Sequence, residues 1–343
     1  MRAFAFNYDQ TPMIQPKFSH QGAKAAAASR PAETQGAPAV LMVRPARFGF
    51  NPQTAQSNRF QREAQESSAS SARAQAEFSA LHGALKAAGV RTCVVADTPQ
   101  PAKPDAVFPN NWVSFHADGT IVVYPMHAAN RRAERRAEIL AAVEAELTFS
   151  RRRLLDFSAE EKRGRYLEGT GSLVIDHINH VAYACRSART DESLVHEWAK
   201  AMQYQAEVFE AADHDGQALY HTNVMLSIGS RCAVICSEAI APKDKQRVLA
   251  RLRASGRELI EVSTAAMVAF ACNVLELRAH TQVGPAQSLL VMSSKARAAF
   301  DPEQWAQLNA SVDCIIDVAI PTIETQGGGG VRCMLAEVPE SRA

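Results

Sequence analysis

Apolar and polar residues follow one another along this chain in a pattern that repeats. Two short apolar runs separated by a turn are followed by a charged stretch with helical periodicity and then by another apolar run. The clearest case is "NWVSFHADGTIVVYP" (111–125), where Asp118 and Gly119 form the turn that most strongly indicates a β-hairpin. The stretch "ANRRAERRAEILAAVEAEL" (129–147) after it predicts a helix. We therefore expect a recurring unit of hairpin, helix and strand.

The same unit recurs in the rest of the chain. Thr190 and Ser193 are candidate caps for one of the later helices. Further hairpins are predicted at 172–186, 223–237 and 272–293, helices at 190–203, 242–255 and 294–311, and strands at 258–263 and 314–320.

The hairpins open at intervals of roughly 50 to 60 residues, slightly longer than the usual repeat periods. The residues at these openings are Asp105, Glu168, His221, Cys272 and Cys333. If the last apolar run, 331–338, pairs with the first, 39–45, the chain closes into a ring of five units. Equivalent hairpin ends would then meet at its centre. This organisation predicts an α/β fold of five repeated units.

The composition indicates a globular protein rather than a nucleic-acid or membrane protein. The chain has 343 residues, 47% of them hydrophobic, and a formal net charge of +1. This charge gives no electrostatic reason to bind nucleic acid or an anionic membrane. We see neither a signal peptide nor a run of about 18 apolar residues. The seven cysteines are scattered and odd in number, which favours reduced thiols in the cytoplasm over a disulfide framework.

Residues 1–37 differ from the rest of the chain. They are rich in Ala, Pro and Gly without helical periodicity, and they predict a flexible N-terminal tail. Residues 38–343 are then expected to form a single catalytic domain that begins with the apolar run "AVLMVRP". The sequence does not give the oligomeric state, and a homodimer is one option.

Polar residues mark the hairpin openings and would meet at the centre of the ring. They provide two carboxylates, an imidazole, a thiol and two amides, from Asp105, Glu168, His221, Cys333, Asn110 and Asn111. A thiol is a good nucleophile only as the thiolate, which a nearby imidazolium stabilises while it also supplies a proton to a leaving group. A carboxylate orients the N–H groups of a substrate through charge-assisted hydrogen bonds. The set suits nucleophilic attack on a nitrogen-substituted carbon.

Each of these residues also has a purely structural interpretation. Cys333 follows four glycines, which form either a slack loop beside a buried cysteine or a close approach of backbone and ligand to a reactive sulfur. Glu168 could be a surface acid and His221 a core histidine. His177 and His180 lack the Cys or Asp residues that would complete a zinc site, so we expect no metal. No Lys-Ser/Thr follows the glycines and no GxSxG occurs, which disfavours a phosphate loop and a serine hydrolase.

Several motifs resemble those of a known family. "GGGGVRCM" is similar to the nucleophile loop of arginine deiminases, and "LEGTG" to their Glu-Gly-Gly segment. "PDAVFPNNW", "NRRAERR" and "SARTDES" resemble segments of dimethylarginine dimethylaminohydrolases. The resemblance extends from about Ala39 to Val338 and implies the guanidino-group-modifying (pentein) superfamily, a fivefold pseudosymmetric α/β propeller. With "HTNV" added, the motifs look most like the citrulline-utilisation hydrolases, also described as amidinotransferase-like or arginine-deiminase-related proteins.

The resemblance assigns roles to residues of this chain. Cys333 matches the nucleophile, His221 the general acid/base, and Glu168 the acid that holds the nitrogen end of the substrate. Arg132 and Arg189 match arginines that bind an amino-acid carboxylate, although a solvated helix face and a charged turn would also explain them. No cofactor is expected, and the substrate is expected to be a small amino acid. The remaining substrate-binding residues implied are Asp105, Asn110, Asn111 and Asn223.

Two departures from the family pattern bear on the substrate. Asn111 and Asn223 stand where relatives that bind a guanidine carry Asp. A guanidinium is a cation with donors only and favours carboxylates, whereas a neutral ureido group has an oxygen that accepts from an Asn amide. Loss of a buried charge contact costs on the order of 2–5 kcal/mol, so arginine should be a poor substrate. The first hypothesis is a cysteine hydrolase that converts citrulline to ornithine, ammonia and carbon dioxide through a covalent thioester-type intermediate.

Two other hypotheses stay open. One is an arginine deiminase, a dimethylarginine hydrolase or an amidinotransferase that uses the same Cys-His route on a guanidino group. The other is a catalytically dead propeller that serves as a binding module, although the intact set of Cys333, His221 and Glu168 argues against it.

Overall fold

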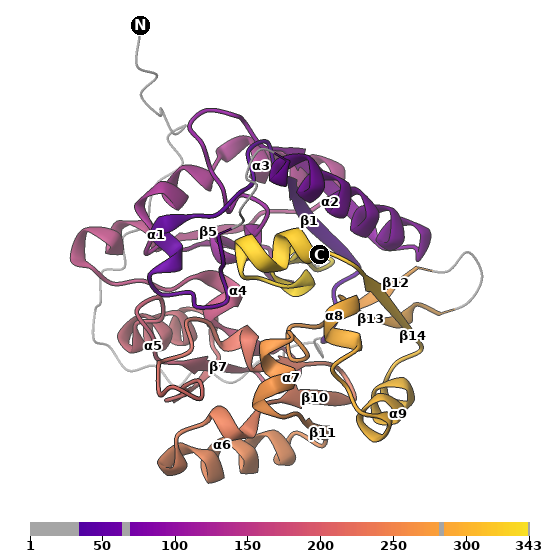
Figure 1. The fold of residues 1–343 in the computed structure, drawn as a ribbon. Helices are drawn as coiled ribbons and strands as arrows, with labels where there is room; N and C mark the ends of the chain where they lie inside the picture. The colour runs from indigo at the N-terminus through magenta and orange to yellow at the C-terminus, as the bar shows by residue number, and fades with distance from the viewer. Residues whose placement is uncertain (1–33, 64–68, 281–284, 342–343) are drawn as a thin grey trace, which may run out of the picture. The chain divides into compact units, whose positions relative to one another are not determined.

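Fifteen short strands and nine α-helices make up the described part of the chain (Figure 1). The structure is a computed structural model that describes residues 34–63, 69–280 and 285–341. The strands are β1 (Ala39–Arg44), β2 (Arg91–Ala96), β3 (Val113–Phe115), β4 (Thr120–Val123), β5 (Arg153–Asp156), β6 (Val174–Asp176), β7 (Val181–Cys185), β8 (Gln205–Phe209), β9 (Leu226–Ile228), β10 (Cys232–Ile235), β11 (Glu258–Glu261), β12 (Leu275–Ala279), β13 (Gln287–Ser293), β14 (Cys314–Val318) and β15 (Ala336–Val338). The α-helices are α1 (Pro52–Ala55), α2 (Ser70–Ala87), α3 (Ala137–Glu146), α4 (Gly169–Ser172), α5 (Glu192–Met202), α6 (Pro242–Ala254), α7 (Thr264–Val268), α8 (Ser294–Arg297) and α9 (Pro302–Ser311).

The strands of the described residues form five separate sheets of three strands each. The sheets are β3-β4-β5, β6-β7-β8, β9-β10-β11, β12-β13-β14 and β15-β1-β2. In every sheet the first two strands are antiparallel and the last two are parallel. The predicted α/β class is therefore confirmed. The predicted unit of hairpin, helix and strand is found four times along the chain, and the fifth sheet has the same strand order but combines β15 with β1 and β2.

A helix connects the two parallel strands of every sheet, as a parallel pair requires a crossover connection. These helices are α3, α5, α6, α9 and α2, in the order of the sheets given above. Helix α2 shows how they pack: Phe78, Leu81 and Leu85 lie at helical spacing on one face and contact a buried cluster that includes Val40 and Met42 of β1. The core is shared between neighbouring sheets, since Ile139 and Val143 of α3 also belong to a buried cluster with Leu41 of β1 and Cys93 of β2.

The predicted helix boundaries are wrong in three places. Asp191, rather than Thr190 or Ser193, caps α5 by accepting from the backbone N–H of Leu194. The stretch 129–147 begins as a short 3-10 helix, Ala129–Glu134, and becomes α-helical only at Ala137. The stretch 294–311 is divided into α8 and α9, because Asp301 and Pro302 start a new, capped helix.

The predicted pairing between the two ends of the folded chain is found. β15 runs antiparallel to β1, with Leu41 opposite Ala336, so that the yellow and indigo ends of the chain share one sheet (Figure 1). This pairing completes the fifth sheet from both ends of the chain.

The residues just before β1 are held by two other sheets. Gln35 donates from Nε2 to the carbonyl of Ile175 and accepts from the backbone N–H of His177. Ala37 forms a parallel bridge to Leu277 of β12. Of the tail predicted for residues 1–37, positions 1–33 lie outside the described residues.

Candidate active site

Polar residues precede the first strand of each sheet. Because each of these strands is an edge strand with the same place in its sheet, the residues before them stand at comparable places in the five units. The residues are Asn110 and Asn111 before β3, Glu168 before β6, His221 and Asn223 before β9, Asn273 before β12, and Cys333 before β15.

The sulfur of Cys333 lies between two side-chain amides. Cys333 is buried on a short 3-10 helix, Val331–Met334. Its Sγ is 3.3 Å from Nδ2 of Asn273 and 3.6 Å from Nδ2 of Asn223. The same two nitrogens also donate to backbone carbonyls, that of Asn273 to Asn223 and that of Asn223 to Thr170. These second bonds hold the N–H groups toward the sulfur, where they stabilise a thiolate.

The surroundings of Cys333 leave the thiol protonated at rest. Burial raises the pKa of the Cys333 thiol, because a charged sulfur loses its hydration there. The hydrogen bond from Asn273, the charge of Arg332 and the hydrogen bond from Asn223 act in the opposite direction, and the net pKa stays above the ordinary value. The two amides are thus the groups that moderate the cost of forming the nucleophile.

His221 and Glu168 form a buried pair. Nε2 of His221 lies 2.8 Å from Oε2 of Glu168, and both side chains are at most 2% exposed. Arg189 approaches the same carboxylate oxygen with Nη1 at 3.4 Å, and the backbone N–H of His127 donates to Oε1 at 3.0 Å. A carboxylate with these partners orients the imidazole and stabilises its protonated form.

The pKa values of this pair indicate a carboxylate beside a neutral imidazole. Burial opposes ionisation of Glu168, but Arg189, the bond to His221 and Arg131 together hold the pKa of Glu168 well below its usual range. Burial lowers the pKa of His221 to about 4, against the hydrogen bond and charge of Glu168, and Arg189 and Arg131 lower it further. At neutral pH His221 is therefore able to accept a proton.

A second buried carboxylate lies in the same region. Oδ2 of Asp105 accepts from Asn51 and Thr54 at 2.7 and 3.0 Å. Its Oδ1 accepts no hydrogen bond from any described residue. Arg131 lies beside it, with Nε 3.8 Å from Oδ2. Asp105 thus keeps one carboxylate oxygen available for the N–H group of a bound molecule.

Arg131 connects this carboxylate to the amide of Asn111. Its Nη1 donates to Oδ1 of Asn111 at 2.8 Å, and Nε donates to Oε1 of Glu134 at 2.9 Å. Burial raises the pKa of Glu134 to about 7, although Arg131 opposes this. Arg131 occupies Oδ1 of Asn111, and one N–H of the same amide donates to Oδ1 of Asn110 at 3.0 Å, so one N–H group remains for a ligand.

These groups line one small cavity. Its volume is about 10 Å³, close to the minimum that holds one water molecule. A segment around α1 covers it: Thr54 bonds to Asp105 and Gln61, and the Gln61 amide donates to the carbonyl of Gly327. At this volume the cavity holds no molecule larger than water.

The four glycines before Cys333 are tightly packed rather than slack. Gly328 has a φ of 64°, and a Cβ there would lie 2.6 Å from side-chain atoms of Asn58 and Gln61. A Cβ at Gly330 would lie 2.7 Å from Oδ1 of Asn273. The carbonyl of Gly328 also accepts from the hydroxyl of Tyr220 at 2.6 Å. Glycine is required here because the chain passes directly against the side chains of the cavity.

The structure brings most of the predicted residues together, while their chemical roles stay predictions. Cys333, His221, Asp105, Asn111 and Arg189 line the cavity. Glu168 and Asn223 contact its members directly, and Asn110 accepts from the amide of Asn111 at 3.0 Å.

Arg132 does not line the cavity. Its Nε donates to the carbonyl of Met126 and lies 3.2 Å from Oε2 of Glu161, and a third of the side chain is exposed. The neighbouring Arg131 occupies the cavity instead. The 3-10 geometry of Ala129–Glu134 turns Arg131 inward. The sequence predicted a regular helix here, and that prediction did not place Arg131 in the cavity.

Asn273 and Tyr220 are site residues that the sequence interpretation missed. Cys272 was expected to open the fourth unit, but it is buried in the apolar core, and its neighbour Asn273 contacts Cys333. The repeat offered a usable signal, because the other predicted hairpins begin at polar residues, namely Asn111, Ser172 and Asn223. Tyr220 lines the cavity and packs under the guanidinium of Arg189, with 5.0 Å between that group and the ring centre.

In the described part of the chain, the His, Cys, Asp and Glu side chains form no group of three or more that could hold a metal ion. No helix there has the length and apolar character needed to cross a membrane.

Five sheets with the same strand order and a buried Cys-His-Glu set are features of one class of protein, the guanidino-group-modifying pentein superfamily. The predicted superfamily is confirmed. The chain belongs to the family described as N,N dimethylarginine dimethylhydrolase, eukaryotic, which it matches over residues 44–340. This membership confirms the predicted enzyme class, a hydrolase of carbon–nitrogen bonds. No curated protein matches the sequence significantly.

Several solved structures share the fold. The chain is similar to ArgZ, an arginine dihydrolase from the ornithine-ammonia cycle in Cyanobacteria, with a TM-score of 0.64 and 16% identity over 89% of this chain and 41% of that one. Unliganded AgrE is similar with a TM-score of 0.66 and 17% identity over 89% of this chain and 40% of that one. A dimethylarginine dimethylaminohydrolase adduct with S-methyl-L-thiocitrulline is similar with a TM-score of 0.60 and 15% identity over 87% of this chain and 98% of that one.

These likenesses show the fold alone, since all the identities are low. The chain spans about two fifths of the length of ArgZ and AgrE. It spans 99% of the separate N-terminal domain of ArgZ, with a TM-score of 0.63.

Proposed function

We propose that this protein is a cysteine hydrolase that acts on the ureido carbon of citrulline and releases ornithine, ammonia and carbon dioxide. One observation carries the proposal: Sγ of Cys333 shares a buried cavity with His221 and is contacted by the amides of Asn223 and Asn273. The carbon attacked by Cys333 would therefore lie among amides and a neutral imidazole, which suits a neutral substrate.

The proposed reaction begins with a neutral thiol and a neutral imidazole. His221 takes the proton of Cys333 while the sulfur attacks the ureido carbon, and Glu168 stabilises the imidazolium that forms. The imidazolium gives this proton to the departing nitrogen, and an S-carbamoyl cysteine remains. His221 then deprotonates a water molecule that attacks the same carbon, the C–S bond breaks, and the imidazolium returns the proton to the sulfur. The carbamic acid that is released decomposes to ammonia and carbon dioxide. One water is consumed for each citrulline, and the thiol is restored.

The charges around the cavity bear on the substrate end. Asp105 and Glu168 face Arg131 and Arg189, and Arg131 also pairs with Glu134, whose pKa burial raises to about 7. While Glu134 is protonated the other four charges balance, and a ureido group keeps this balance, whereas a guanidinium would add a positive charge. The ureido oxygen would accept from an Asn amide, and the ureido N–H groups would donate to the available oxygen of Asp105.

A second candidate is hydrolysis of arginine or a methylated arginine by the same route. The available Oδ1 of Asp105 favours it, because a buried carboxylate oxygen without a donor also suits a cationic N–H group. The names of related structures point the same way, since ArgZ is described as an arginine dihydrolase and AgrE was crystallised with L-arginine.

We also propose that the five sheets form a fivefold propeller, which their common strand order and the pairing of β15 with β1 support. A cytoplasmic location is proposed from the scattered cysteines of the sequence alone.

A substrate comparison tests the proposed function. The purified chain is incubated with citrulline, arginine and dimethylarginine, and both ammonia and the amino-acid product are measured. Ornithine from citrulline, with arginine turned over much more slowly, supports the first candidate, and preferential turnover of arginine or dimethylarginine supports the second. The Cys333→Ser variant should lose turnover with its fold intact, because a hydroxyl is a far weaker nucleophile at neutral pH. Equal activity of this variant would remove the covalent mechanism, and inertness toward all three substrates would favour a binding module.

A further inference from the structure

A second cavity lies at the opposite ends of the strands that begin at the candidate active site. It is lined by residues at the ends of β3, β6, β12 and β15, namely Phe115, His177, Arg278 and Glu337, together with Glu340 and residues 34–37. It shares no lining residue with the cavity around Cys333. Any ligand of this cavity therefore binds apart from the reacting sulfur.

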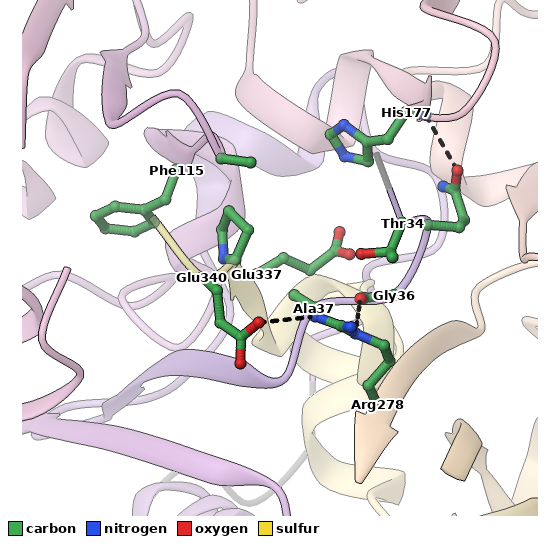
Figure 2. Close-up of a pocket in the computed structure, with 11 residues that line it drawn as sticks. Thr34, Gly36, Ala37, Phe115, His177, Arg278, Glu337 and Glu340 are labelled. Atoms are coloured by element: carbon green, nitrogen blue, oxygen red, sulfur yellow. Dashed lines mark hydrogen bonds and ion pairs between the residues drawn. The ribbon is translucent and has the colours of Figure 1, made fainter. Parts of the chain in front are cut away.

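The size of the second cavity suits a small molecule. Its volume is about 140 Å³, similar to the cavity of about 150 Å³ that accommodates benzene in another protein. The aromatic ring of Phe115 and the methyl group of Ala37 provide an apolar part of the wall (Figure 2). An amino acid with a short side chain fits this space, whereas a peptide or a nucleotide does not.

A guanidinium and a carboxylate face this cavity with part of each group unoccupied. Nε of Arg278 donates to the carbonyl of Gly36 at 3.0 Å, and Nη2 lies 3.5 Å from the Glu340 carboxylate (Figure 2). Within the described residues, Nη1 of Arg278 has no partner. Glu337 accepts from Arg332 at 3.2 Å with Oε2, and its Oε1 likewise lacks a donor there.

The charges of these groups specify the kind of ligand. Arg278 pairs with Glu340, and Glu337 pairs with Arg332, which lies behind the lining of the cavity, so these four charges cancel. The cavity does present one unoccupied donor nitrogen and one unoccupied acceptor oxygen. A molecule that carries both a carboxylate and an ammonium group satisfies both without adding net charge.

We propose that this second cavity is a binding site for a small zwitterionic amino acid, with its carboxylate on Arg278 and its ammonium group on Glu337. The site does not depend on the reaction proposed above, because binding there requires neither Cys333 nor His221.

Binding of L-norvaline, measured by isothermal titration calorimetry on the full chain, tests the proposal. Norvaline has a short apolar side chain and neither a ureido nor a guanidino group, so it is not a substrate of either candidate reaction. Saturable binding is expected. Pentanoate and butylamine, which each lack one of the two charged groups, should bind about tenfold more weakly or worse, as loss of a charge-assisted hydrogen bond implies.

Two arginine variants locate the binding site. Arg278→Gln should weaken norvaline binding about tenfold or more, and Glu337→Gln should do the same through the ammonium group. Arg189→Gln, which alters an arginine of the other cavity, should leave norvaline binding unchanged. The proposal is overturned if norvaline does not bind the unaltered chain, if Arg278→Gln binds it equally well, or if Arg189→Gln weakens it as much as Arg278→Gln. Thermal unfolding of each variant confirms that the comparison is made on folded protein.

Discussion

Nε2 of His221 lies 2.8 Å from Oε2 of Glu168, and burial keeps water from both side chains. Burial and the charge of Glu168 act on the pKa of His221 in opposite directions. Burial favours the neutral imidazole, and the carboxylate favours the imidazolium. The carboxylate thus determines how readily His221 accepts the proton that Cys333 must lose.

Glu168→Gln should lower kcat about a hundredfold for whichever substrate the comparison of citrulline, arginine and dimethylarginine selects. This loss lies in the range typical of lost acid–base catalysis. Because the Glu168 charge raises the pKa of His221, its removal should also move the acid limb of the kcat/KM profile to lower pH. The measurement is a pH profile of both proteins. A lower kcat with an unmoved acid limb would show that Glu168 only maintains the structure.

His221 should lower the stability of the protein as pH falls from 6.5 to 4. The pKa of His221 is about 4 in the folded chain, below the value of 6.5 usual for the unfolded chain. At this group the unfolded state therefore binds more protons in this window, which lowers the free energy of unfolding by an amount on the order of a few kcal/mol. Glu168 acts in the same direction as His221 below its ordinary pKa, because its pKa is also lowered on folding. Glu134 acts in the opposite direction, because burial raises its pKa to about 7 on folding.

Urea unfolding at several pH values measures the contribution of His221 as the difference between the unaltered chain and His221→Asn, whose free energy of unfolding should fall less, or rise more, as pH is lowered from 6.5 to 4. A curve with the same slope in this variant would assign the effect to other groups.

Asn273→Ala should make Cys333 harder to ionise. Its amide is the hydrogen-bonding group that most lowers the pKa of the thiol. The rate of alkylation by iodoacetamide should therefore rise only at higher pH, and should be about tenfold slower at neutral pH. A Cys314→Ser background removes the exposed thiol. Asn309→Ala, on the exposed face of α9, serves as the matched control and should not change the rate. Equal rates in all three proteins would mean that Asn273 does not act on the sulfur.

Asn223→Asp should shift preference from citrulline toward arginine more strongly than Asn111→Asp. A carboxylate at 111 would pair with Arg131, which already donates to that position at 2.8 Å, so its charge would be largely neutralised. A carboxylate at 223 would stand beside the sulfur without such a partner. The ratio of kcat/KM for the two substrates measures the shift. An unchanged ratio in both variants would contradict the argument from the ureido oxygen.

Gly328→Ala should destabilise the chain and reduce turnover. Its positive φ disfavours a side chain, and the new Cβ would press against Asn58 and Gln61. A loss of roughly 1–3 kcal/mol is expected from such backbone strain. Gly49→Ala is the matched control, since nothing lies within 4 Å of a Cβ there. Equal melting temperatures for the two variants would show that the glycine loop tolerates side chains.

The repeat and the main polar positions could be predicted from the sequence because each has a local signal. Hairpin turns such as Asp118-Gly119 depend on neighbouring residues, and Gly119 has the positive φ that such a turn needs. Cys333, His221 and Glu168 stand at matching positions of the units. Their convergence followed from the pairing of the last strand with the first.

Arg131 and Asn273 could not be assigned in the same way. In "NRRAERR" two adjacent arginines are equivalent by composition, and only the 3-10 turn determines that Arg131 is buried and Arg132 is partly exposed. Asn273 directly follows Cys272, at which the sequence places the opening of the fourth unit. In both cases a displacement of one residue along the chain decides which side chain reaches the cavity or the sulfur of Cys333, and that depends on tertiary packing.

The central place of β1 in its sheet bears on where the chain can be shortened. The family match begins at residue 44, which excludes all of β1 except its last residue. A protein expressed from residue 44 onward would leave β15 without the strand it pairs with, and β15 directly follows the turn that carries Cys333. The start of a usable fragment lies at or before Gln35, whose side chain contacts Ile175 and His177. Inactivity of a shorter fragment would reflect a missing strand rather than missing chemistry.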